Sequence, residues 1–194
     1  MNKGNEMETV YTNPTDAAKA IRLELKANFP GIKFRVKTHK YSGGDSINIY
    51  WVLGPTGAAV DKIVKKYEYG RFDGMTDYAY TEDTLVSCPD GSIKCLGGSK
   101  YVFTNREYAE TWEGEEPFKE LIARDLCSLI GIEFVNMGTN ITGRKEFDNH
   151  CSMHTVVGLI LSHTDLTKGY KGIRRTETKC SGSFADFYEI IPER

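Results

Sequence analysis

Apolar positions with a helical period open the regular part of the chain. Asn13-Pro14-Thr15-Asp16 predicts a helix start. Asparagine caps a first turn, proline suits its first position, and an early aspartate lies at the positive end of the helix dipole. Ala18, Ile21 and Leu25 then fall on one face, and Phe29-Pro30-Gly31 ends the helix.

A β-hairpin and a second helix are predicted next. Residues 32–37 alternate apolar and basic side chains, and residues 46–51 alternate polar and apolar ones, on the two sides of a glycine turn at residues 42–45. One face of this hairpin is therefore apolar and is expected to pack on the helix, while the other is basic and polar. Helical spacing then returns at four apolar positions, Val60, Ile63, Val64 and Tyr67.

The rest of the pattern predicts shorter elements. Residues 1–12 are expected to be a loose leader and residues 70–77 an ordered, glycine-rich loop. Short strands are expected within residues 78–86, 88–95 and 101–104. The later elements are a helix from Pro117, a strand at 132–135, a helix at 149–162 and a hairpin of 172–178 with 183–191.

Together these elements predict an α+β fold. A helix–β-hairpin–helix two-layer unit is extended by short antiparallel strands, and a C-terminal part of two helices and a β-hairpin follows. Five glutamates between residues 107 and 116 mark a boundary, which divides the chain into residues 1–106 and 107–194. One continuous domain is the alternative.

Composition and charge narrow the class of protein. With 40% hydrophobic and 27% charged residues, the chain is typical of a globular domain. No apolar run approaches the ~18 residues of a membrane span, so a membrane is not an expected partner. The start of the chain has no apolar signal core, and the five cysteines are irregularly spaced. Both observations favour a cytoplasmic protein with reduced thiols.

The net charge of −2 is spread unevenly. Residues 1–75 carry 12 basic and 8 acidic groups (+4), residues 76–150 carry 7 and 14 (−7), and residues 151–194 carry 6 and 5 (+1). A basic front and an acidic middle indicate two surfaces of different character.

Three stretches resemble one known family. They are Lys40-Tyr41-Ser42-Gly43-Gly44-Asp45-Ser46-Ile47, Trp51 with Gly54-Pro55-Thr56, and Arg71-Phe72-Asp73-Gly74-Met75-Thr76-Asp77. With the opening helix they resemble the large polyvalent protein-associated domain 29 family over roughly residues 14–80. The resemblance implies a phage, plasmid or conjugative-element setting and a small α+β fold, and it implies no reaction. The usual hypothesis for such domains is that they help an invading element survive host defences.

The basic hairpin face is the first candidate site. Lys33, Arg35, Lys37 and His39 alternate along one strand, and Tyr50 on the partner strand is expected to share their face. Cations ~6–7 Å apart along a strand suit a phosphate backbone, and a tyrosine offers a stacking surface. The alternative is a solvated sheet face whose lysines prevent edge pairing.

The loop that carries the resemblance is the second candidate. Its residues of interest are Phe72, Asp73, Gly74, Met75 and Asp77. The two aspartates are candidates for metal binding or acid–base chemistry. The alternative is structural, because aspartates in glycine turns usually accept bonds from nearby backbone N–H groups.

A four-residue metal site is a weaker candidate. Cys88 and Cys95 would join His150 and His154, which are four apart and share a face if they are helical. The cysteine spacing is wider than in the usual zinc knuckle, and buried thiols with helix-end histidines are the alternative. No metal or other cofactor is therefore predicted.

The acidic segment is a candidate for protein contact. Tyr108, Trp112, Glu113 and Glu115 combine aromatic rings with carboxylates, a combination that suits a basic partner surface. A solvated linker is the alternative.

Three functional hypotheses follow. The chain has no G-x-S-x-G, P-loop or dinucleotide fingerprint, so no catalytic residue is assigned and an enzyme is not favoured. The leading hypothesis is a mobile-element-encoded accessory binding protein that contacts a host or element protein and interferes with a host defence system. The others are a nucleic-acid-binding module that uses the basic hairpin face, and an enzyme or metalloprotein that uses Asp73 and Asp77. The pattern leaves the oligomeric state open.

Overall fold

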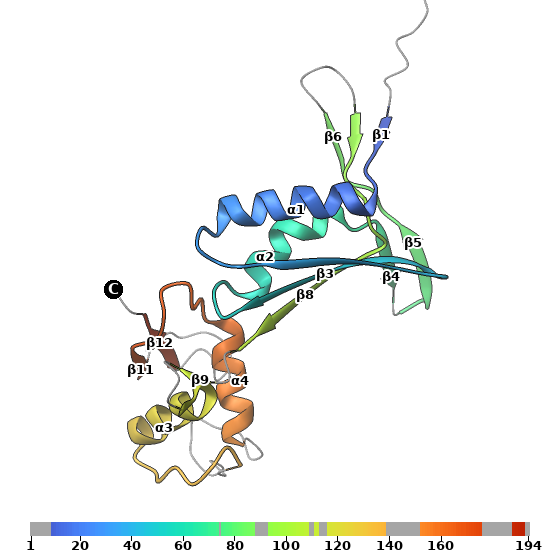
Figure 1. The fold of residues 1–194 in the computed structure, drawn as a ribbon. Helices are drawn as coiled ribbons and strands as arrows, with labels where there is room; N and C mark the ends of the chain where they lie inside the picture. Colours follow the sequence, from blue (N-terminus) through green and yellow to red (C-terminus); the bar gives the residue numbers. More distant parts are fainter. Residues whose placement is uncertain are drawn as a thin grey trace, which may run out of the picture. The chain divides into compact units, whose positions relative to one another are not determined.

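The computed structural model describes residues 9–73, 75–87, 93–108, 111–112, 116–138, 152–175 and 188–192. The chain forms two compact units, Met1–Trp51 with Gly57–Asn105, and Val52–Thr56 with Arg106–Arg194. Helices and short strands occur in both (Figure 1), which confirms the α+β class. No helix in the described part of the chain is long and apolar enough to cross a membrane.

The described helices and strands have the following bounds. Up to residue 107 they are β1 (Thr9–Tyr11), α1 (Pro14–Asn28), β2 (Arg35–Tyr41), β3 (Gly44–Val52), α2 (Gly57–Val64), the 3-10 turn η1 (Lys65–Tyr67), β4 (Gly70–Asp73), β5 (Tyr78–Thr81), β6 (Leu85–Ser87), β7 (Ile93–Cys95) and β8 (Tyr101–Glu107). After it they are β9 (Thr111–Trp112), β10 (Glu116–Pro117), α3 (Phe118–Ile130), α4 (Met153–His163), β11 (Gly172–Arg175) and β12 (Tyr188–Ile191).

The opening helix is capped as the sequence predicts. The side-chain oxygen of Asn13 accepts hydrogen bonds from the N–H groups of Thr15 (3.0 Å) and Asp16 (2.9 Å), and Pro14 is the first helical residue. These bonds satisfy two N–H groups that have no partner inside the helix. The predicted apolar face is buried, with Ala17, Ala18, Ile21 and Leu25 at its centre.

Two layers form the first unit (Figure 1). Strands β2, β3 and β8 make a sheet in that order, and β2 and β3 form the predicted antiparallel hairpin. Helices α1 and α2 pack on one face of this sheet. Their shared core includes Ile21, Leu25, Ile47, Ile49, Trp51, Val60, Val64 and Val102. No helix among the described residues of this unit lies on the other face of the sheet (Figure 1).

Two smaller sheets flank this layer. Residues 9–11, which were expected to lie in a loose leader, form β1 and pair in parallel with β7, and β6 pairs with β7 on its other side. The leader prediction was wrong here because parallel pairing joins distant segments and leaves no local signal. Residues 70–73, predicted as part of a loop, instead form strand β4, and residues 75–77 form a turn before β5.

The second unit has its own core. Helices α3 and α4 supply most of it, and the hairpin β11–β12 confirms the closing hairpin over the residues described. Phe118 packs edge-on against Tyr170, whose hydroxyl donates to Asp125 (2.6 Å). One local prediction was wrong: residues 132–135 are irregular rather than a strand.

Arg106 joins two segments of the second unit. Its guanidinium donates to the carbonyl oxygens of Leu53 and Gly54, and to those of Leu161 and Thr164 at the end of α4. The four distances lie between 2.7 and 3.2 Å. Burial lowers the pKa of Arg106 from its usual range. The planar fork of arginine matches several carbonyls at once and satisfies the last turn of the helix.

Removal of the Asn13 cap tests the start of the first unit. Asn13→Ala is expected to lower the free energy of unfolding by about 1 kcal/mol, because two helix N–H groups lose their acceptor. Urea denaturation followed by circular dichroism measures the change. Leu23→Ala is the control, since Leu23 is 71% exposed on the same helix. An equal loss in both variants would contradict the capping role.

Arg106 offers a second stability test. Arg106→Met keeps an unbranched side chain without donors and is expected to cost about 2–4 kcal/mol, because buried carbonyls lose their partners. Arg106→Lys is expected to recover only part of the loss, since an ammonium cannot reach several carbonyls in a planar fork. Urea denaturation, with hydrogen exchange of the α4 amides, measures both. Unchanged protection of α4 in Arg106→Met would contradict the assignment.

Candidate functional site

One face of the sheet β2-β3-β8 is left open within the first unit. Val36, Ile49 and Val102 face the helices and are buried. The hydroxyl of Thr104 also points to that side, because it donates to Asp61 of α2 (2.8 Å). Side chains alternate along a strand, so the residues between these positions lie on the open face.

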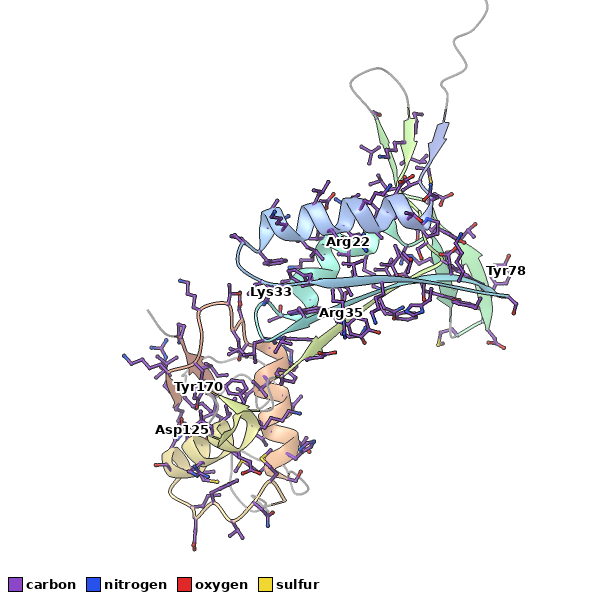
Figure 2. The ribbon with its side chains drawn as sticks, viewed as in Figure 1. Arg22, Lys33, Arg35, Tyr78, Asp125 and Tyr170 are labelled. Carbon is purple, nitrogen blue, oxygen red and sulfur yellow. The ribbon has the colours of Figure 1, made fainter. Side chains whose placement is uncertain are left out.

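The basic row lies on this open face, as the sequence predicts for strand alternation. Arg35, Lys37 and His39 of β2 are exposed and stand opposite Tyr50, Asn48 and Ser46 of β3. Lys33 is exposed and precedes the strand. The guanidinium of Arg35 lies 4.7 Å from the centre of the Tyr50 ring. Figure 2 shows Arg35 on the side of the sheet that faces away from α1.

Two aromatic residues of β8 complete the face, and the sequence analysis missed them. Tyr101 and Phe103 flank the buried Val102, and their rings stack at 5.9 Å with 27° between their planes. Phe103 is 48% exposed. The alternation in residues 101–103 indicated a strand, but only the tertiary structure brings that strand beside Tyr50 and β3.

Asp45 holds the start of β8 against the hairpin. Its carboxylate accepts hydrogen bonds from the hydroxyl of Ser99 (2.7 Å) and the backbone N–H of Lys100 (2.9 Å). The ammonium of Lys100 donates to the carbonyl oxygen of Gly43 (2.9 Å). A carboxylate that accepts two such bonds anchors the chain strongly.

Strand β4 begins against the same segment, Ser99–Lys100. The N–H of Gly70 donates to the carbonyl oxygen of Lys100 (3.0 Å), and a Cβ added at Gly70 would lie 2.3 Å from that oxygen. Only glycine therefore fits this approach. The hairpin turn at Gly43 and the strand that begins at Gly70 thus both contact Lys100.

A pocket of about 420 Å³ lies where these segments meet. Its walls come from residues 69–71, residues 78–81 and the pair Lys100–Tyr101. Tyr78 and Tyr80 are stacked in it at 6.4 Å with 12° between their ring planes, and they are 63% and 44% exposed. Burial, with a smaller contribution from the Asp45 carboxylate, raises the pKa of Tyr69. None of these tyrosines was predicted as a site residue from the sequence.

The described loop candidates lie at the end of β4 and in the turn residues that precede β5. Met75 is 95% exposed, and Asp77 is exposed with a backbone φ of 51°. The backbones of Phe72 and Asp73 end β4, but their side chains lie outside the described part, as does Gly74. A turn position with positive φ is one that aspartate tolerates better than most residues.

The metal candidates fall in different parts of the chain. Cys95 is buried in the first unit and His154 is exposed on α4 in the second, while Cys88 and His150 lie outside the described residues. Among the residues that the structure describes, no group of three or more His, Cys, Asp or Glu side chains gathers as a metal site would require.

The acidic segment is only partly described. Tyr108 packs against the core of the second unit, with the cations of Arg106 and Lys119 at 5.4 and 5.3 Å from its ring centre. Trp112 lies in β9, but its side chain is outside the described part, and so are Glu113 and Glu115.

The Asp45 anchor can be tested directly. Asp45→Ala is expected to lower the free energy of unfolding by about 2–3 kcal/mol, because the half-buried donors on Ser99 and Lys100 lose a charged acceptor. Asp45→Asn is expected to cost less, since one carbonyl oxygen remains. Urea denaturation measures both. An Asp45→Ala protein as stable as the native chain would show that the anchor does not hold β8.

Comparison with known proteins gives one match. The family model described as large polyvalent protein associated domain 29 matches residues 12–109. This range extends beyond the stretches that suggested the family and includes β8 with Tyr101 and Phe103. No curated protein and no solved structure matches the chain. The chain belongs to the large polyvalent protein associated domain 29 family, whose domains come from mobile-element and phage proteins.

Proposed function

We propose that the first unit binds single-stranded nucleic acid across the open face of the sheet β2-β3-β8. The observation that supports this most is the combination on one face of a basic row on β2 with aromatic rings on β3 and β8. The basic row alone would also suit a solvated surface. The exposed ring of Phe103 and the half-buried rings of Tyr50 and Tyr101 on the same face are what favour a nucleic-acid ligand.

The cations supply the sequence-independent part of the affinity. Arg35, Lys37 and His39 occur at every second position, so they lie ~6–7 Å apart along the strand. That spacing is close to the distance between successive phosphates of an extended strand. Neutralising each phosphate releases counterions, which makes such binding strongly dependent on salt.

The aromatic residues favour a single strand over a duplex. Rings of Tyr50, Tyr101 and Phe103 offer flat surfaces to bases, and bases reach them only when they are not paired and stacked within a double helix. Base–aromatic stacking contributes about 1–3 kcal/mol for each base. Every base has such a face, so we expect little sequence preference.

The hypothesis of contact with a host defence protein stays a prediction. Its candidate residues Glu113 and Glu115 lie outside the described part, and Tyr108 packs into the second unit. The candidate residues of the open sheet face, in contrast, all lie within the described part of the chain. Nucleic-acid binding is therefore the better-supported function for this family member.

Charge neutralisation on the open face tests the proposal. The double variant Arg35→Gln/Lys37→Gln is expected to bind a fluorescent 12-nucleotide single strand at least tenfold more weakly near 0.1 M salt. If both contacts are lost, the slope of log K against log salt should become shallower by about 1.4, since each contact contributes about 0.7 for single strands. Fluorescence anisotropy at several salt concentrations measures both quantities.

A charge-matched control separates the face from the net charge. Lys26→Gln/Lys62→Gln removes the same charge from exposed positions on α1 and α2, which cover the opposite face. It is expected to bind almost as well as the native chain. Equal weakening in both double variants would indicate non-specific attraction, and no binding by the native chain would overturn the proposal.

A further inference from the structure

The pocket beside β4 and β5 has the chemistry of a nucleotide site. Tyrosine rings and two cations, Arg71 and Lys100, line it, and no acidic residue is among the described residues of its wall. A volume of about 420 Å³ is in the range of small-ligand sites. A flat ring joined to an anion is the ligand that such walls complement.

The two tyrosines of β5 supply the stacking surface. Tyr78 and Tyr80 project from the same side of their strand with nearly parallel rings, and Arg71 stands directly opposite Tyr80 in the β4–β5 ladder. The labelled Tyr78 lies at the end of the first unit where β4 and β5 meet (Figure 2). Exposed parallel rings are costly to hydrate unless a ligand covers them.

The cations are held in place by protein contacts. Nε of Arg71 lies 3.1 Å from a carboxylate oxygen of Glu82, which orients the guanidinium. The ammonium of Lys100 is held by the carbonyl oxygen of Gly43 and lies 5.5 Å from the Tyr101 ring centre. An ammonium has three donors, and Gly43 takes one of them. A phosphate near Lys100 would therefore meet a positioned cation.

Tyr101 connects the pocket with the open sheet face. It lines the pocket, and it also stacks on Phe103 of the same strand. A single strand that follows the rings of the open face would therefore reach the pocket at one end. Tyr101 is therefore shared by the pocket and the open face.

We propose that this pocket binds one nucleotide of the strand, with the base against Tyr78 and Tyr80 and the phosphate at Lys100 and Arg71. The inference rests on the proposed binding of single strands and deepens it. The pocket would then be the subsite for the nucleotide at one end of the strand that lies on the open face. It also predicts that a free nucleoside monophosphate binds there without the rest of the strand.

Isothermal titration with adenosine monophosphate, and separately with the 12-nucleotide strand, tests the subsite on the full chain. The native chain is expected to bind the monophosphate in the millimolar range or tighter, and adenosine at least fivefold more weakly. Tyr80→Ala is expected to weaken both the monophosphate and the strand at least fivefold. Its matched control is Tyr50→Ala, which removes a tyrosine from the open face and should weaken the strand alone.

The outcomes separate the two proposals. If the strand binds but Tyr80→Ala changes neither ligand, the subsite is wrong and the proposed function stands. If the monophosphate binds through Tyr80 but the strand does not bind, the pocket is a free-nucleotide site and the proposed function fails. If Tyr50→Ala and Tyr80→Ala weaken the monophosphate equally, the binding is not in this pocket. Circular dichroism of each variant confirms that it folds.

Discussion

The first unit depends on the two hydrogen bonds that Asp45 accepts from Ser99 and Lys100. They join the turn of the hairpin to a segment more than fifty residues later in the chain. That segment begins β8 and also carries the carbonyl groups on which β4 starts. One carboxylate thus holds together the strand that completes the open face and the strand that walls the pocket. A glycine at position 70 is needed at the same point, because any side chain there would collide with the Lys100 carbonyl.

The two-layer architecture explains why one sheet face is available for binding. Helices α1 and α2 bury the apolar side of β2, β3 and β8, so the apolar requirement of folding is met on that side alone. Large rings on the opposite side, such as Phe103, do not contribute to that core. Phe103 shares the open face with Arg35 and Lys37, with strand β3 between them, and the proposed strand would cover this ring.

Local patterns predicted the helix, the hairpin and the basic row, because their signals lie within a few residues. The Asn13 cap and the alternation from residue 32 to residue 51 are of this kind. Features that depend on contacts between distant segments could not be predicted in this way. The parallel pairing of β1 with β7, and the position of Tyr101 and Phe103 beside β3, follow from tertiary structure and have no local signature. At residues 132–135 a local pattern predicted a strand that does not form. Ile132 and Phe134 pack against the core of the second unit instead, and short apolar runs do not distinguish these two uses.

Photo-crosslinking identifies the residues of the protein that a bound single strand contacts. A single strand that carries bromouridine is bound to the full chain and irradiated, and the crosslinked peptides are mapped by mass spectrometry. Stacking on the open face predicts crosslinks at Tyr50, Tyr101 or Phe103, which decrease as salt is raised. Crosslinks confined to α1, α2 or the second unit would contradict the account, because the strand would then bind away from the open face.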